Sequence, residues 1–538
     1  MRYSLPKSVT VAVAISCGLV TTAQAALTIS NAKTKNVTCT GGVCTPTGSN
    51  ANLNVGELQT MLASSDVTVK SSAGTPTLGV LDAVTWASTH RLTLDAYQFI
   101  HVRAPVVVEG VAGLTLITND GGSGGDYIFE SGGYANFWDL ASSLVINRHS
   151  YTLVGDVETL ASDIAINPSG SYALAASYDA TPDGVYDPPP IGLFDGSFEG
   201  LGNSISNFSE TSSSKFAGLF RQIGSQGAVS NLGLGNAVIS AEEKHAVAGA
   251  LASSSDGYVK NVFGTVSLRG EETFGGLVGV NNGTITSARP VAQIYGPVRV
   301  GKNANFQAAG GGLVGVNNGQ ITDCHLTGFV SGASLHKDAR VTLLLGGLAG
   351  LNAESGRVDR SSAHVAMWGS SSVGGLIGNN AGAVSNSFAT GDVSAWEFAV
   401  IGGLIGTSLP TSVASNVFAT GHVTKSYVHA SAGGLIGTFF AGGVLQESYA
   451  SGEITGQHGR GGLIARFLAS GGVSDNYWDI DTSGVDHGIG NGADPPGITG
   501  LTDAQLKSAL PAGFDPNVWG QSASINNGWP YLLANPPQ

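Results

Sequence analysis

The sequence predicts an all-β fold, a parallel β-helix or solenoid that is followed by a small C-terminal cap. Three observations lead to this prediction. A glycine-rich phrase recurs through the second half of the chain, each copy is followed by short strand-like runs, and only 12% of the 538 residues are charged while 42% are hydrophobic. Because each repeat stacks only on its neighbours, such an array forms one elongated body.

The composition excludes two classes of protein. The chain contains 79 glycines, about twice the usual share of roughly 7%, but they follow no Gly-X-Y period, so a collagen-like helix is excluded. The formal net charge is −14. Nucleic-acid binding depends on clustered cations that neutralise phosphates, so we expect no nucleic-acid partner.

Residues 1–25 have the parts of a secretory signal peptide. Arg2 and Lys7 precede an apolar run from Val9 to Val20, and Ala23-Gln24-Ala25 forms a small-residue cleavage site. The run is shorter than the about 20 residues that a membrane-spanning helix needs, and no later segment qualifies. We therefore expect an exported protein, secreted or at the cell surface, with no transmembrane segment.

The cysteines leave two questions open. Cys17 allows a lipoprotein signal as an alternative, but Ala14 stands where a large aliphatic residue is expected. In an oxidising compartment, Cys39 and Cys44 are close enough in sequence to form a small disulfide loop, which would leave Cys324 as an odd thiol. No zinc-binding spacing is present.

Residues 26–190 predict an N-terminal β-rich region. Short alternating runs such as Val67 to Lys70 are separated by Gly and Asn, as in an all-β sheet or solenoid. One amphipathic helix is expected from Asn54 to Ala63, with Asn54 as its N-cap. Asp187-Pro188-Pro189-Pro190 is the predicted connector to the next region, because proline cannot donate a hydrogen bond to a sheet.

Residues 191–475 are predicted to form the repeat array. We call its recurring unit, Gly275-Gly276-Leu277-Val278-Gly279, the glycine–leucine phrase. The leucine of the phrase recurs at Leu277, Leu313, Leu348, Leu376, Leu404, Leu435 and Leu463. The intervals between successive leucines are 36, 35, 28, 28, 31 and 28 residues. We expect the leucine to point into the coil and the paired glycines to allow a sharp corner or a close backbone approach. A helical repeat is disfavoured, since each glycine costs about 1 kcal/mol inside a helix.

Two series of side chains recur at fixed places in the repeats. Asparagines follow the phrase at Asn281, Asn317, Asn352 and Asn380. They are expected to form an amide ladder along the stack, with a sugar-binding strip as the alternative. Another fixed place in the repeats holds an aromatic residue or a histidine, at Phe263, His325, Phe388, Phe418, Tyr449 and Tyr477. For this series we expect an aromatic stack inside or along the coil.

The repeats carry a family resemblance. Together with residues 194–207 ahead of them and Asn476 to Gly484 behind, they resemble the GLUG-repeat proteins, and Leu92 to Tyr97 and Tyr172 to Ala175 resemble filamentous haemagglutinin-like large exoproteins. This resemblance implies a right-handed β-helix in a bacterial surface or secreted adhesin. It also implies an outer-membrane secretion partner, although Asn167-Pro168-Ser169-Gly170 only partly matches the Asn-Pro-Asn-Gly signature of such exoproteins. A secreted metallopeptidase family carries GLUG repeats too, but this chain lacks its His-Glu-x-x-His motif.

No catalytic, cofactor or metal residues are predicted. Asp479 to Gly484 matches the opening of a calcium loop, but its twelfth position is Gly490 where a bidentate Glu is needed, so a turn is preferred. Residues 476–538 are the predicted cap. Thr502 to Leu510 is its expected helix, and Trp519, Trp529, Pro530, Tyr531 and Leu532 are expected to cover the open end of the stack.

We predict a non-enzymatic, adhesin-like protein that binds a host-cell or extracellular-matrix protein or glycan surface. The alternatives are a β-helical polysaccharide lyase or hydrolase and a passive structural spacer. An enzyme of the first kind would bring three or more acidic residues and a Lys or Arg together in one groove. Local function is expected in the insertions that lengthen two repeats, around Pro290 to Gln307 and Ser331 to Thr342.

Overall fold

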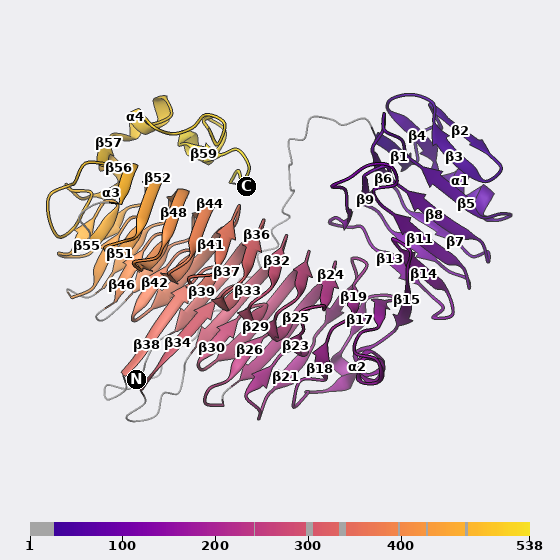
Figure 1. The fold of residues 1–538 in the computed structure, drawn as a ribbon, viewed down its shortest axis with the longest axis horizontal. Coiled ribbons are helices and arrows are strands. Elements are labelled where there is room, and N and C mark those ends of the chain that lie inside the picture. Colours follow the sequence, from indigo (N-terminus) through magenta and orange to yellow (C-terminus); the bar gives the residue numbers. More distant parts are fainter. Residues whose placement is uncertain are drawn as a thin grey trace, which may run out of the picture.

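The protein consists of two stacks of parallel β-strands (Figure 1). The computed structural model describes residues 26–241, 243–296, 305–332, 340–395, 399–426, 429–468 and 472–537. The predicted signal peptide, residues 1–25, lies outside the described residues. In the described part of the chain no helix is long and apolar enough to cross a membrane, and the longest, α2 (Val157–Ile166), has 10 residues.

The N-terminal stack has three short strands per coil, one in each of three sheets. The first sheet contains β4 (Ala51–Asn54), β1 (Ala26–Ser30), β6 (Thr77–Val80), β9 (Phe99–Val102) and β12 (Tyr127–Phe129). The second contains β7 (Val84–Trp86), β10 (Val106–Val108) and β13 (Ala135–Phe137). The third contains β3 (Val43–Pro46), β5 (Val67–Lys70), β8 (Arg91–Asp95), β11 (Gly113–Ile117) and β14 (Ser143–Ile146), with β2 (Val37–Thr40) antiparallel to β3. Alternate residues of these strands fill one core.

The predicted helix is present as α1 (Val55–Leu62), and it covers the first end of this core. The Asn54 side chain accepts a hydrogen bond from Glu57 N at 3.2 Å, which makes it the N-cap. Leu58 and Leu62 are buried in the N-terminal core, and Gln59 Nε2 donates to Thr85 O of β7 at 2.9 Å. The helix thereby covers apolar side chains that an end coil would otherwise expose.

The two stacks meet where the chain reverses. β15 (His149–Val154) pairs antiparallel with β14, and from β16 (Ser171–Leu174) onward the long stack grows by parallel pairing. The core therefore changes at about residue 150, earlier than the predicted connector at 187–190. Ala135 N and Phe137 N of β13 donate to Leu201 O and Ala175 O, at 2.9 and 2.8 Å, so the stacks are also joined by backbone hydrogen bonds.

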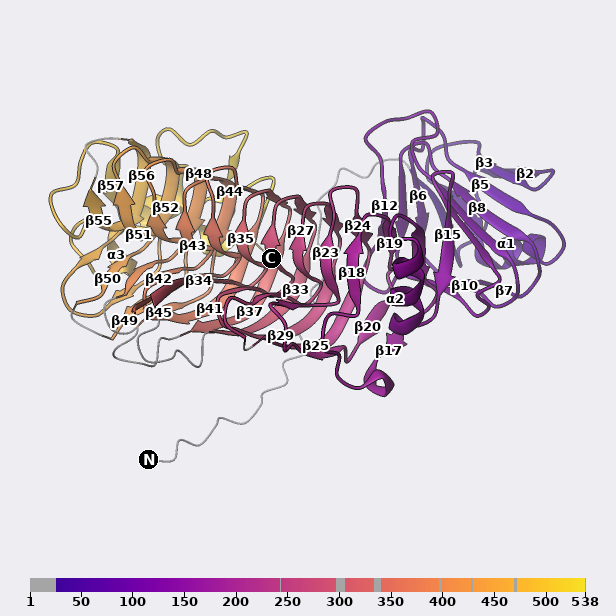
Figure 2. The ribbon, with the colours of Figure 1, turned by 60° about the horizontal axis from the view of Figure 1, so that its bottom comes forward.

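The long stack is built from three sheets of parallel strands (Figure 2). The sheet of ten strands contains β18 (Ile191–Phe194), β23 (Phe220–Ile223), β27 (Ala252–Ser255), β31 (Val278–Asn281), β35 (Val314–Asn317), β39 (Ala349–Asn352), β43 (Ile377–Asn380), β47 (Ile405–Ser408), β51 (Ile436–Phe440) and β55 (Ile464–Leu468). The sheet of nine strands contains β22 (Phe216–Ala217), β26 (Val247–Gly249), β30 (Thr273–Gly275), β34 (Asn305–Gly311), β38 (Arg340–Gly346), β42 (Ser372–Gly374), β46 (Val400–Gly402), β50 (Ser431–Gly433) and β54 (Arg460–Gly461).

The third sheet of the long stack carries most of the variation between coils. Most of the earlier coils contribute a short and a long strand to it. In the coil of β19, β20 (Ser204–Ser206) and β21 (Ser209–Thr211) take the place of the long strand. The short strands are β19 (Ser197–Glu199), β24 (Ala228–Ser230), β28 (Tyr258–Lys260), β32 (Thr284–Thr286), β36 (Gln320–Thr322) and β40 (Arg357–Asp359). The long ones are β25 (Gly233–Ala241), β29 (Phe263–Gly270), β33 (Arg289–Gly296), β37 (His325–Gly332) and β41 (Ser362–Gly369). The later coils continue with β44 (Ala383–Ala389), β48 (Val413–Ala419), β52 (Val444–Ala450), β56 (Val473–Asp479) and β57 (Ile498–Leu501).

The glycine–leucine phrase forms the corner between the nine-stranded and ten-stranded sheets. Gly275 ends β30, Val278 begins β31, and Leu277 N donates to Leu313 O of the next coil at 2.9 Å. A Cβ atom at Gly276 would stand 2.1 Å from Gly312 O, so the next coil leaves no room for a side chain. Leu277 and Val278 are both fully buried. The expected close backbone approach is confirmed, but both aliphatic residues of the phrase lie in the core.

The repeated asparagines form the predicted amide ladder. Asn281, Asn317 and Asn352 each donate through Nδ2 to the side-chain oxygen of the next asparagine, ending at Asn380, at 2.8 Å every time. All four side chains are fully buried. The alternative of a sugar-binding strip is wrong, because no ligand reaches a ladder that lies inside the coil.

Replacing Asn352 with alanine should destabilise the coils around it by about 2 kcal/mol, since it leaves Asn317 Nδ2 and Asn380 Oδ1 buried without a ladder partner. Amide hydrogen exchange across β35 to β47 measures this loss. The matched control is Asn318→Ala, which removes a hydrogen bond of equal length between exposed side-chain amides, from Asn318 to Asn282, in the turn one coil earlier. Equal losses in the two variants would show that burial does not set the strength of the ladder.

The sequence predicted that C-terminal residues cover the open end of the stack, and this prediction is wrong for residues 503–537, which we call the C-terminal segment. Trp478, Ile489 and Ile498 belong to the core of the long stack and close its last coil. The C-terminal segment instead runs back over the outside of the third sheet, where Asn535 Nδ2 donates to Ser361 O and Asn386 O at 3.2 and 3.0 Å (Figure 1). The predicted helix is present as α4 (Asp503–Ser508), capped by Thr502 and Gln505.

Candidate binding surface

The predicted aromatic stack exists only in the later coils, where the protein covers it with its own chain. In the earlier coils Phe263 and His325 are paired in register with Arg289 and Ser362, so the series is interrupted there. The rings of Phe388 and Phe418 stack at 4.6 Å with an interplanar angle of 6°, and Phe418 and Tyr449 stack at 5.1 Å and 7°. The register of β44, β48 and β52 sets these contacts, because it places the three residues opposite one another. All three lie on the outside of the third sheet, in a small core of their own.

The C-terminal segment completes this small core. Trp519 lies 6.1 Å from Phe418 and 6.0 Å from Tyr449 between ring centroids, and stacks on Phe514 at 4.5 Å. Tyr449 donates through its hydroxyl to Pro530 O at 2.7 Å. Burial raises the pKa of the Tyr449 hydroxyl well above its ordinary value. These rings therefore serve to hold the C-terminal segment and are closed to a ligand.

The earlier coils leave the outside of the third sheet accessible. We define the open face as the outward-pointing residues of β29, β33, β37 and β41, strands that lie side by side (Figure 1). Inward residues of these strands, such as Val266, Ile294 and Val330, are fully or almost fully buried. The outward residues are Phe263, Thr265, Ser267, Arg269, Arg289, Val291, Gln293, Tyr295, His325, Thr327, Phe329, Ser331, Ser362, His364, Ala366 and Trp368.

Aromatic rings from successive coils form a strip along the open face. Arg269 Cζ lies 5.6 Å from the ring centroid of Tyr295, and the Tyr295 and Phe329 rings are 6.0 Å apart. The next coil adds Trp368, which is 38% exposed and pairs in register with Ser331. Tyr295 and Phe329 are half-buried, and Arg269 is exposed. Partly exposed aromatic side chains beside arginine are typical of binding surfaces.

The open face is positively biased in a negatively charged protein. Its outward residues include Arg269 and Arg289 and contain no Asp or Glu. Burial, with the Arg289 charge as a further cause, lowers the pKa of His325 to about 4, so that imidazole is neutral near pH 7. Its Nδ1 lies 2.9 Å from Ser362 Oγ, whereas His364 is exposed with Nδ1 2.9 Å from Thr390 Oγ1.

Part of the open face lies in the first predicted insertion. Val291, Gln293 and Tyr295 belong to the range 290–307, and Ser331 begins the range 331–342. Residues 297–304 and 333–339, the centres of both insertions, lie outside the described residues. The sequence did not reveal the strip, because the longer repeats hide which outward residues become neighbours. Alternation of period two in each long strand was the signal that marks them as outward.

Carboxylates gather around a cation at several places in the described part of the chain, and two of these clusters are partly exposed. Lys70 pairs with Asp95 at 2.8 Å and with Asp120, and Arg360 pairs with Asp323 at 2.8 Å and with Asp359. Each cluster brings two carboxylates onto one cation. Neither contains the three acidic residues that we required for a polysaccharide-active site. A further group combines Asp479, Asp481 and Asp503 with Lys507, but Asp479 is fully buried and caps α3 (Ile480–Ser483), so these carboxylates do not converge in an open groove.

The calcium-like motif is a turn, as expected. Asp479 Oδ1 accepts hydrogen bonds from Asp481 N and Thr482 N, at 2.9 and 3.1 Å, and so caps the helical turn α3 (Ile480–Ser483). Gly484 ends this turn at a φ of 66°, a left-handed conformation that glycine adopts readily. Over the described ranges, His, Cys, Asp and Glu form no group of three that could hold a metal ion.

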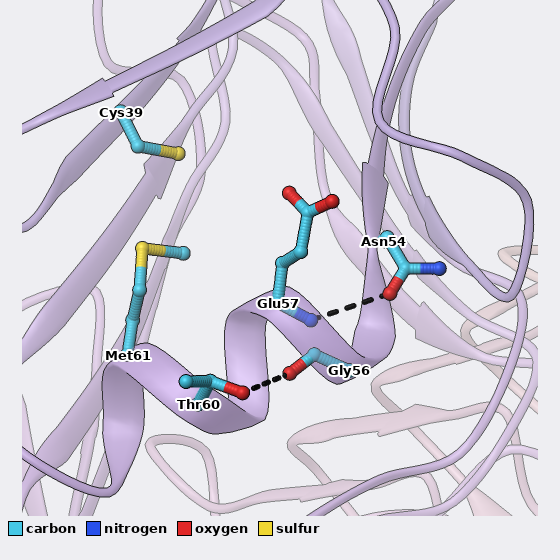
Figure 3. A pocket seen from close by; sticks show the side chains of 6 residues that line it. All are labelled: Cys39, Asn54, Gly56, Glu57, Thr60 and Met61. Atoms are coloured by element: carbon cyan, nitrogen blue, oxygen red, sulfur yellow. Dashed lines mark hydrogen bonds between the residues drawn. The ribbon is translucent and has the colours of Figure 1, made fainter.

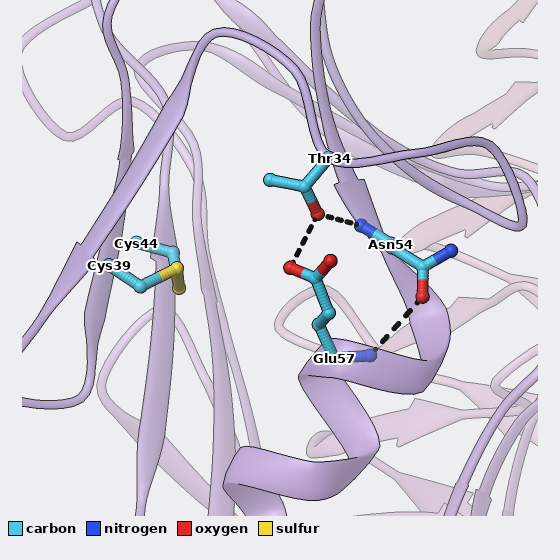
Figure 4. The surroundings of a disulfide bond; sticks show 5 residues. All are labelled: Thr34, Cys39, Cys44, Asn54 and Glu57. Carbon is cyan, nitrogen blue, oxygen red and sulfur yellow. Dashed lines mark hydrogen bonds between the residues drawn. A yellow bond between two sulfur atoms is a disulfide. The ribbon is translucent and has the colours of Figure 1, made fainter.

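A shallow hollow lies beside α1, near the disulfide (Figure 3). Its lining residues include Asn54, Glu57, Thr60 and Met61. Glu57 Oε2 accepts a hydrogen bond from Thr34 Oγ1 at 2.7 Å, so its carboxylate already has a partner (Figure 4). The hollow thus belongs to the closed end of the N-terminal stack.

The cysteines are arranged as the sequence allowed. Cys39 and Cys44 form a disulfide across the hairpin of β2 and β3. Cys324 is a free thiol inside the long stack, and burial raises its pKa to about 12. It therefore stays protonated near neutral pH and is shielded from oxidants.

A buried polar network joins the two stacks, and we call it the joint. Glu199 is almost fully buried and accepts hydrogen bonds from Tyr127 Oη, Asn231 Nδ2 and Leu201 N at 2.8, 2.9 and 3.1 Å. Lys260 forms an ion pair with Asp126 beside it. Burial raises the pKa of Glu199 to about 7, although its hydrogen bonds act in the opposite direction.

Comparison with known proteins finds similarity over parts of the chain. Residues 369–394 match the GLUG motif. Over 187 residues the chain is 30% identical to Halomucin of Haloquadratum walsbyi, a match that covers 33% of this chain and 2% of Halomucin. An IgA1 protease structure is 20% identical with a TM-score of 0.35, over 54% of this chain and 20% of that one. The motif and the similarity to Halomucin suggest a surface or extracellular protein, whereas the haemagglutinin-like resemblance stays a prediction.

Proposed function

We propose that this protein is a non-enzymatic, adhesin-like protein that is exported by its signal peptide and remains outside the cell. In this proposal the coils form a right-handed parallel β-helix, and the open face binds a host-cell or extracellular-matrix surface. An outer-membrane secretion partner completes the export route.

One observation carries the proposal, the aromatic strip on the open face. The third sheet has aromatic residues on its outside in both the middle and the later coils of the long stack, but the C-terminal segment buries those of the later coils. The strip of Tyr295, Phe329 and Trp368 keeps accessible ring surface. Large side chains cost free energy when they are left in water, so an accessible strip of them is best explained by a partner.

The test is surface binding by the mature protein, residues 26–538, in which Tyr295 and Trp368 are both replaced by alanine. We expect the double variant to lose about tenfold in affinity for cultured cells or extracellular matrix, because it removes two rings of the strip. The matched control is Phe440→Ala, which removes a ring that is 37% exposed on the ten-stranded sheet. Undiminished binding by the double variant would exclude the open face as the adhesive surface.

A further inference from the structure

We propose that the open face binds an anionic glycan, a chain of sugar units with carboxylate or sulfate groups, and that this chain lies along the axis of the stack. The inference rests on the proposed function and names its ligand. The source to which we commit is a polysaccharide held on an extracellular surface.

The spacing of the strip fits a sugar chain. Stacked parallel strands lie about 4.8 Å apart, which is close to the length of one pyranose unit in an extended glycan. The Tyr295 and Phe329 rings, 6.0 Å apart on adjacent coils, therefore face successive units. The C–H face of a pyranose packs against the electron-rich face of an aromatic ring. Trp368 extends the same surface by one coil.

Polar side chains lie beside the rings on the same strands. Gln293 and Ser267 are paired in register, as are Thr327 and His364. All four are at least partly exposed. They offer donors and acceptors to the hydroxyl groups that surround a pyranose ring, which a purely apolar patch would leave unpaired. This mixture distinguishes the open face from a surface meant for a hydrophobic partner.

The charge of the open face selects an anionic glycan. Arg269 lies at the ring of Tyr295, and Arg289 is at the opposite end of β33, in register with Phe263. A guanidinium group forms paired hydrogen bonds with carboxylate or sulfate, and the absence of Asp and Glu from these outward residues removes local repulsion. The rest of a protein with a net charge of −14 disfavours an anion elsewhere, so binding is directed to this face.

A single-stranded nucleic acid is the competing ligand, since bases also stack on aromatic rings. Such a ligand brings one phosphate per nucleotide and needs a groove of cations along its backbone. The outward residues of four coils supply only two arginines here. The observations thus favour a glycan, in which anionic groups are held by a few arginines and the rings contact the sugars.

The experiment measures binding of the mature protein to four immobilised probes: polygalacturonate, dextran sulfate, neutral dextran and a single-stranded DNA oligonucleotide. We expect binding to at least one of the two anionic glycans, and the two arms tell carboxylate from sulfate. The double variant, Tyr295→Ala with Trp368→Ala, should bind the anionic glycan about tenfold more weakly. Arg269→Gln should also weaken binding to the anionic glycan about tenfold. Tyr295→Phe should retain binding, since it keeps the ring, and Phe440→Ala serves as the control.

Three outcomes would overturn the inference. They are equal binding to neutral dextran, preferred binding to DNA, and no glycan binding by a protein that still adheres to cells through the open face. The last outcome leaves the proposed function intact and points to a protein partner. If the protein binds neither cells nor glycans, the proposed function fails as well. Circular dichroism of each variant shows that the stack remains folded.

Discussion

Replacing Trp519 with alanine should release the C-terminal segment from the long stack, with a local loss of about 4 kcal/mol. Trp519 is 1% exposed and contacts Phe418, Tyr449 and Phe514. Its Nε1 also donates to Asn416 Oδ1 at 3.0 Å. The variant loses this bond and leaves a cavity between the segment and the sheet, while the coils retain their own core.

Hydrogen exchange and limited proteolysis of residues 503–537 measure this release. Exposure of Phe388, Phe418 and Tyr449 should also increase binding of a hydrophobic dye. The matched control is Trp138→Ala, because Trp138 is 68% exposed and its loss leaves little cavity. If both variants exchange alike in the C-terminal segment, Trp519 does not anchor it.

Replacing Glu199 with glutamine should remove the loss of folding stability that ionisation of this buried carboxyl group causes as pH rises. The Glu199 pKa is raised from 4.5 to about 7 in the folded protein. Between these two pH values the folded state holds one more proton than the unfolded state, so stability falls as pH rises. The loss amounts to roughly 3 kcal/mol, since one pKa unit corresponds to about 1.4 kcal/mol. Glutamine stays neutral and should therefore be more stable than glutamate at pH 8 and similar at pH 4.

Other ionisable groups lie beside Glu199 at the joint. Tyr127 and Tyr151 face the carboxyl group, and burial raises the pKa of both hydroxyls. The Lys260 charge lowers the Glu199 pKa, and Lys260 is itself paired with Asp126.

Urea unfolding from pH 4 to pH 8, with hydrogen exchange at β12 and β19, measures how Glu199→Gln changes the pH dependence of stability. Exposed Glu354→Gln is the control. A Glu199→Gln protein with the pH dependence of the parent would refute a neutral carboxyl at the joint.

The local features of the repeat were predictable because each depends on one coil and its identical neighbour. Glycines at 275 and 276 imply a close approach of backbones, and asparagines at equal positions imply a ladder, whatever the rest of the chain does. The helix at 55–62 was equally predictable, since Asn54 and the spacing of Leu58 and Leu62 are local signals.

The repeat pattern was sufficient to predict the all-β architecture, the inward leucines and the recurrence of an aromatic position. Which aromatic residues remain accessible depends on tertiary contacts that the pattern does not contain. Phe388, Phe418 and Tyr449 were predicted as a series, yet a segment some hundred residues later covers them, and such a contact leaves no periodic trace in sequence. Arg269, Tyr295, Phe329 and Trp368 become neighbours only through the registers of four strands separated by insertions of unequal length. The joint likewise pairs Glu199 with Tyr127 across two stacks, because the chain reverses between them.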